Sequence, residues 1–288
     1  MERFFIGHWL TNLIIPGDPD QLTINTPAGS WELRKASGFN DGRAAIVNNG
    51  KTTETYSIEL TGCYTSSRAV AVNAASEELI PICLAASYLT ALSVTPTKSL
   101  FSSEVKFITV GHYFPRPRSM GPGFPVTNDT AEFADLVEAF VRAYTIQGAV
   151  EKIRLIAHHF LDGLAFWSLE DLVLSTTTIL EVIAATANSL ARPNIPTNNF
   201  NLRVDFAASR FNLPTLPSDF RNMRNDLIHQ GTLSGTKFPN KDLTACIAAV
   251  TEALNWIDGY IFSAMQLGPI PSKRFAQKDF RGVNCFSL

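Results

Sequence analysis

The residues best suited to chemistry lie in one polar stretch, residues 220–231, which reads Phe-Arg-Asn-Met-Arg-Asn-Asp-Leu-Ile-His-Gln-Gly. The stretch is typical of the end of a helix, because Gly231 follows its last polar residue. Arg224 and His229 are separated by four residues, and the polar Asn225 follows the arginine. A helix advances by about 100° per residue, so Asn225 and His229 share one face, and the long stem of Arg224 can reach that face.

These residue types suit proton transfer beside a phosphate. The partial negative charge at a helix C-terminus favours imidazolium, so His229 would change its charge near neutral pH and could give or take a proton. Arg224 offers a fork of donors for phosphate oxygens. The pair suits metal-independent RNA cleavage, in which the 2′-hydroxyl attacks the adjacent phosphate. Asn225 would hold one ring nitrogen of His229, and Arg221 is a further supporting residue; no cofactor or metal is expected.

The helix itself needs an apolar side, and we expect Met223, Leu227 and Ile228 to supply it. The polar residues also have a purely structural interpretation, because basic side chains in the last turn of a helix complement its dipole. The same spacing recurs at Arg154 and His159, but there it falls inside a periodic helix with no stop signal. Spacing alone is therefore a weak signal.

The segment 224–231, preceded by mostly apolar helices and followed by one more long helix, resembles the HEPN superfamily of abortive-infection type. The resemblance covers residues 130–265, about half of the chain. It implies a helical bundle that dimerises and joins two motifs into one composite ribonuclease site. It also implies Arg224 and His229 as the catalytic pair, with Asn225 in support. Many members are toxins or phage-defence effectors, and others have lost activity and serve as binding modules.

Composition sets the frame for these residues. The 288 residues are 45% hydrophobic, enough for a sizeable core, and the net charge is −2. That charge argues against a large RNA-coating surface, although not against a small cleft with local arginines. The four cysteines are widely scattered without zinc-site spacing, which predicts reduced thiols in the cytoplasm. They are Cys63, Cys83, Cys246 and Cys285.

No membrane segment is expected. The opening residues lack the apolar core and the cleavage site of a signal peptide. The most apolar run, residues 79–94, is sixteen residues long and contains Pro81, so it is shorter than the roughly twenty residues of a membrane span. We interpret it as a buried helix.

Residues 1–111 are predicted to form a β-rich domain with one helix, over residues 77–94 and capped by Ser76. The Asn-Asn-Gly-Lys sequence at 48–51 predicts a tight hairpin turn. In the strand that follows it, apolar residues alternate with polar ones, which predicts one wet face. The domain is a candidate sensor for a ligand or a protein trigger. Strands are expected at 4–15, 21–25, 31–35, 44–47, 53–60 and 105–110.

A segment rich in proline and glycine, residues 112–126, is predicted to be the linker between two domains. Residues 127–268 are predicted to form the HEPN-like helical domain, and residues 269–288 an extended or frayed tail. Between the motif helix and the last helix, residues 232–239 are predicted to be a flexible connector, and Asn240 to cap the last helix. Residues 192–217 are predicted to be rich in loops, with a short amphipathic piece near 204–211. Helices are expected at 127–145, 149–164, 168–190, 218–230 and 240–265.

The sequence thus predicts an α+β protein, with a β-rich N-terminal module followed by an all-α helical bundle. The function that it favours is a homodimeric, metal-independent endoribonuclease acting on RNA as a toxin or phage-defence effector. One alternative keeps the fold as an inactive binding or dimerisation module for a nucleotide or a protein partner. Another makes the protein the neutralising partner of a toxin.

Overall fold

The computed structural model of the protein describes residues 2–27, 29–65, 67–100, 123–165, 168–192, 195, 199–278 and 285–286. The chain forms two compact units, Met1–Thr145 with Cys285–Leu288, and Ile146–Asn284. The strand predicted at 105–110 lies outside the described residues, as does the predicted linker up to residue 122. A sheet in the first unit and a helical second unit confirm the predicted α+β class.

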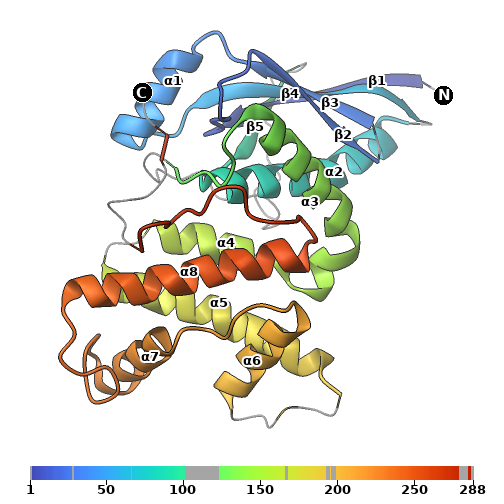
Figure 1. The fold of residues 1–288 in the computed structure, drawn as a ribbon. Helices are drawn as coiled ribbons and strands as arrows, with labels where there is room; N and C mark the ends of the chain where they lie inside the picture. The colour runs from blue at the N-terminus through green and yellow to red at the C-terminus, as the bar shows by residue number, and fades with distance from the viewer. Residues whose placement is uncertain are drawn as a thin grey trace. The chain divides into compact units, whose positions relative to one another are not determined.

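The first unit is built on a five-stranded antiparallel sheet in the order β2-β3-β4-β1-β5 (Figure 1). One face of the sheet is apolar because large side chains alternate along the strands. Tyr56, Ile58 and Leu60 of β4 are all buried, as their alternation with polar residues predicted. The strands are β1 (Glu2–Thr11), β2 (Gln21–Thr26), β3 (Gly29–Lys35), β4 (Glu54–Thr65) and β5 (Thr95–Ser99).

Two helices lie between these strands instead of the single one predicted. Helix α1 (Phe39–Asn49) replaces both the strand predicted at 44–47 and the hairpin turn predicted at 48–51. Gly50 ends this helix with a φ of 58°, and its N–H donates to the carbonyl of Ile46 at 2.9 Å. Asn-Gly occurs both in tight turns and at helix ends, because both require positive φ. Helix α2 (Arg68–Thr90) begins earlier than predicted, with Ser67 as its cap.

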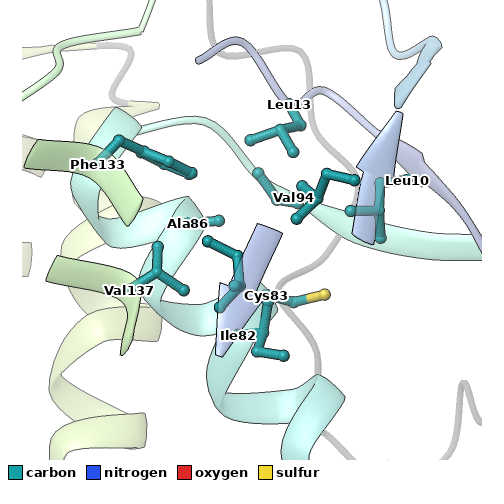
Figure 2. Close-up of a pocket in the computed structure, with 10 residues that line it drawn as sticks. Leu10, Leu13, Ile82, Cys83, Ala86, Val94, Phe133 and Val137 are labelled. Carbon is teal, nitrogen blue, oxygen red and sulfur yellow. The ribbon is translucent and has the colours of Figure 1, made fainter. Parts of the chain in front are cut away.

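Helices α2 and α3 (Thr130–Val150) cover the apolar face of the sheet. A small cavity remains where the two helices meet the strands (Figure 2). Leu10 of β1, Ile82 and Cys83 of α2, and Phe133 and Val137 of α3 contribute to its lining. Its volume is about 10 Å³ and its walls are apolar, so it is a gap in core packing and not a ligand site. Burial raises the pKa of the Cys83 thiol, which favours the protonated form.

In the second unit, α5 (Leu169–Leu190) is the central helix and contacts the other four helices (Figure 1). Ser168 caps it at the predicted start of the helix, because its hydroxyl accepts a hydrogen bond from the Asp171 N–H at 3.2 Å. Threonine is a poor helix former, but Thr176 is fully buried and its hydroxyl donates to the Leu172 carbonyl at 2.7 Å. The other helices are α4 (Ile153–Leu164), α6 (Phe200–Arg210), α7 (Ser218–Gln230) and α8 (Leu243–Ala264).

Two predictions about the last helix and the tail are wrong. The cap of α8 is Asp242 and not Asn240, because the Asp242 carboxylate accepts from the Ala245 N–H at 2.8 Å. The start of the tail is not frayed. Arg274 is fully buried and forms an ion pair with Asp258 of α8 at 3.1 Å, so this segment is part of the folded unit.

Two helices among the described residues are long and apolar enough to cross a membrane by length and composition alone. They are Ala69–Thr90 and Leu169–Leu190, and more than half of each window is buried inside the molecule. Core helices of soluble proteins share this pattern, so the apolar signal is weak evidence for a span and is compatible with a soluble protein.

Candidate active site on helix α7

Helix α7 carries the motif that the sequence singled out, and it ends where the sequence predicted. Gly231 has a φ of 69°, and its N–H donates to the Leu227 carbonyl at 3.0 Å, which closes the last turn. Phe220 and Met223 are fully buried and anchor the helix. Ile228 was predicted to belong to this anchor, but it is 45% exposed.

Arg224 is held on three sides by neighbouring side chains. Its Nη2 lies 2.5 Å from Oε1 of Glu181 on α5, and its Nη1 donates to the Asn225 side-chain oxygen at 3.3 Å. The guanidinium also lies over the ring of Phe200 on α6, 4.3 Å from the ring centroid. Only 15% of the Arg224 side chain is exposed, and its buried Nε has no hydrogen-bond partner among the described residues. The guanidinium is therefore fixed against α5 and α6, and its Nε donor makes no hydrogen bond to the described residues.

His229 has the opposite environment. It is exposed on the last turn of α7, and within the described part of the chain its ring makes no hydrogen bond or ion pair. The side-chain oxygen of Asn225, predicted to hold the histidine ring, instead accepts from Arg224. The imidazole is therefore open to solvent and to any substrate that approaches this end of the helix.

Arg221, predicted as a supporting residue, joins α7 to its surroundings. Its guanidinium pairs with the carboxylate of Asp205 on α6, and its Nε donates to the Leu216 carbonyl at 3.0 Å. These contacts use its donors inside the unit. Because Phe200 meets Arg224 and Asp205 meets Arg221, α6 and α7 run antiparallel along this contact.

Asp226 lies within the motif, and it has a structural role that the sequence pattern did not indicate. Its side chain is fully buried and accepts from the backbone N–H groups of Gly235, Lys237 and Phe238 at 2.7–3.1 Å. Burial alone would raise the pKa of Asp226, but these donors lower it below its ordinary value. The connector at 232–239, predicted to be flexible, is thus fixed onto the end of α7. The only sequence signal for this was an aspartate followed by a run of Ser, Gly and Thr.

A larger polar groove lies in the first unit. Its volume is about 570 Å³, within the range of small-molecule sites, and it is open to solvent. β1, the turn before α1 and the start of β4 form its walls, with Trp9 and Glu54 among the lining residues. The Glu54 carboxylate is already paired with Lys98 at 3.0 Å. Among the described residues, no group of three or more His, Cys, Asp or Glu side chains is arranged to hold a metal ion.

Comparisons of the chain with protein-family models, with curated proteins and with solved structures find no match.

Proposed function

We propose that this protein is a metal-independent endoribonuclease of HEPN type, with Arg224 and His229 as its catalytic pair. The observation that carries the proposal is the contrast on α7 between a fixed guanidinium and an exposed imidazole, which makes no hydrogen bond to any residue that the structure describes. A group that moves protons needs access to the substrate, whereas a group that stabilises charge needs a defined position. The two side chains meet these separate requirements within the last two turns of one helix.

The reaction is an internal transesterification. His229 accepts the proton of the ribose 2′-hydroxyl as its oxygen bonds to the adjacent phosphorus, and the bond from phosphorus to the 5′-oxygen breaks. A second proton donor protonates that leaving oxygen. Arg224 binds the phosphate oxygens as negative charge builds on them. The products are a 2′,3′-cyclic phosphate and a 5′-hydroxyl end, and neither water nor a redox partner is consumed.

Two copies of the chain complete the site in this proposal. Among the described residues, one copy supplies a single exposed histidine, whereas the reaction requires one group to accept a proton and another to give one. A homodimer through the helical domain, which the HEPN resemblance implies, supplies His229 twice. The exposed apolar Ile228 next to His229 fits a surface that a second copy covers.

We extend the proposal to biological role and location. A toxin or phage-defence effector must be restrained until it is needed, and the polar groove of the first unit is a candidate place for a ligand or protein trigger. Free Cys83 and Cys246, both buried, are compatible with a reduced cytoplasmic protein.

The test is incubation of the purified protein with mixed RNAs in excess EDTA. We expect the wild type to cleave RNA and to leave 2′,3′-cyclic phosphate ends, and His229→Ala and Arg224→Ala to lose activity while retaining the fold. The matched control is His159→Ala, which removes the histidine of the equally spaced Arg154 pair on α4. Equal cleavage by all four proteins would contradict the assignment, and so would loss of folding in the two α7 variants.

The second candidate function is an inactive binding or dimerisation module, and one contact favours it. Glu181 holds the Arg224 guanidinium, which must leave this carboxylate in order to bind a phosphate. Glu181→Gln separates the two functions. The neutral amide competes less with an RNA phosphate for the Arg224 guanidinium, and it has nearly the same size as the carboxylate. We expect RNA cleavage by Glu181→Gln to exceed that of the wild type, whereas a binding module remains inactive with either residue.

A further inference from the structure

The arginines of α6 and α7 differ in one respect. These two helices carry four arginines, and three of them have carboxylate partners: Arg210 with Glu151, Arg221 with Asp205, and Arg224 with Glu181.

Arg203 is the exception. It has no ion pair with any residue that the structure describes, and its buried Nε has no hydrogen-bond partner there. Buried donors are normally satisfied, so an arginine in this state calls for an acceptor from outside.

Arg203 is linked to the candidate active site through Phe200. It lies three residues after Phe200 on α6, so the two side chains are neighbours on one helix surface. Phe200 in turn carries the Arg224 guanidinium on its ring. Two carboxylates that contact the arginines of these helices, Glu181 and Asp205, are paired with Arg224 and Arg221. An anion that arrives beside Arg224 therefore meets a guanidinium, on the partly exposed side chain of Arg203, that no described carboxylate compensates.

We infer that Arg203 binds a backbone phosphate of the RNA strand next to the cleaved one, and so positions the substrate. The inference rests on the proposed ribonuclease function. A protein with a net charge of −2 has no overall field that would attract RNA, so binding must depend on individual unpaired cations. Arginine suits this role because its planar fork matches phosphate oxygens and stays charged at every relevant pH. The Arg221 and Arg210 guanidiniums are engaged inside the unit, which leaves Arg203 as the available cation on α6.

The test measures RNA binding separately from cleavage. In a His229→Ala background, a fluorescein-labelled single-stranded RNA is titrated with the full chain in EDTA, at several salt concentrations, by fluorescence anisotropy. We expect Arg203→Ala to raise Kd by about tenfold, as expected for loss of one charge-assisted contact. The slope of log K against log salt should fall by roughly 0.7, which corresponds to one phosphate on a single strand. Arg203→Lys retains the charge and should preserve the salt slope, with only part of the loss in affinity.

The matched control is Arg192→Ala. Arg192 is an exposed arginine of the second unit, and its Nη1 donates to the carbonyls of Ser189 and Ala191. We expect its removal to leave Kd and the salt slope unchanged. In the cleavage assay, Arg203→Ala should raise KM and leave kcat within twofold, because the residue binds the strand and does not touch the reacting atoms. Circular dichroism and thermal unfolding establish that each variant is folded.

The possible outcomes separate this inference from the proposed function. If the wild type cleaves RNA and Arg203→Ala has an unchanged Kd, salt slope and KM, the inference is wrong and the ribonuclease stands. If no variant cleaves but RNA binding depends on Arg203 as described, the phosphate contact stands and the ribonuclease fails. If the protein neither binds nor cleaves RNA, both are overturned.

Discussion

Asp226 and His229 are three residues apart on α7, yet their environments are opposite. Three backbone N–H groups surround the buried carboxylate, whereas the imidazole is exposed and makes no hydrogen bond within the described chain. Asp226 thus stabilises the fold, and His229 is accessible to a substrate. The sequence could not make this distinction, because it depends on the connector folding back over the end of the helix. A local pattern shows only that both residues are polar.

Because Asp226 holds the connector, we expect its substitution to lower the stability of the protein. We expect Asp226→Asn to lower Tm by several degrees, because an amide replaces one of the accepting oxygens with a donor that faces N–H groups. Hydrogen exchange should speed up at the amides of Gly235, Lys237 and Phe238. The matched control is Asp219→Asn, which alters an exposed carboxylate on the same helix. Unchanged exchange at the connector in Asp226→Asn would show that the carboxylate does not hold it.

The same residue predicts how the connector responds to pH. Because the pKa of Asp226 is lower in the folded protein than its ordinary value of 3.8, the charged form is the one that stabilises the connector. The stabilisation is complete above that ordinary value and is lost as pH falls through the lowered one. We therefore expect the wild-type connector to be as protected at pH 5 as at pH 7, and to lose protection only below about pH 4. Asp226→Asn should lack this acid transition, whereas Asp219→Asn should retain it.

At the scale of elements, the sequence predicted best where local signals and burial agree. For α5, Ser168 precedes a long stretch of apolar residues at helical spacing, and the helix begins directly after this serine. The motif helix α7 likewise ends at its predicted glycine. The prediction failed at α1, where Gly42 and three asparagines lower the helix propensity and Asn-Gly imitates a hairpin turn. Packing against β4 stabilises α1, and no local pattern records that contact.

Substitution of two helical glycines by alanine should change the free energy of unfolding in opposite directions. A Cβ added to Gly163 of α4 would lie 3.1 Å from the Ser175 Cβ on α5, which is closer than most Cβ contacts in proteins. A Cβ added to Gly259 of α8 would lie 3.5 Å from the Leu213 side chain, an ordinary van der Waals distance. We expect Gly163→Ala to lower the free energy of unfolding by about 1 kcal/mol through overpacking. Gly259→Ala should raise it by about 0.5–1 kcal/mol through helix propensity. Urea unfolding of both variants checks the signs, and a gain at Gly163 would mean that α4 and α5 are less closely packed than described.

At the scale of the whole molecule, each unit is stabilised by contacts between residues far apart in the chain. In the second unit, the buried Glu151 accepts from the Tyr260 hydroxyl at 2.7 Å and pairs with Arg210, which joins the start of α4 to α6 and α8. In the first unit, Glu138 of α3 accepts from the Asn25 N–H of the edge strand β2 at 2.7 Å. Such pairs occupy edges and junctions that periodicity does not describe. They explain why the sequence predicted most elements but few of the contacts between them.

The pair of Arg274 and Asp258 gives the prediction for the molecule as a whole, because it fixes the chain after α8. Both side chains are at most 2% exposed, and the guanidinium also lies 5.3 Å from the Phe160 ring centroid on α4. We expect Arg274→Ala to lower the free energy of unfolding by about 3–5 kcal/mol, since it leaves a buried carboxylate without its cation. The double variant Arg274→Met with Asp258→Leu should recover most of this loss, because neither charge is then buried. Denaturant unfolding of Arg274→Met, of Asp258→Leu and of the double variant measures the coupling. If the double variant were as unstable as the sum of the singles, the pair would act through packing alone, and the tail would be held by its apolar contacts rather than by charge.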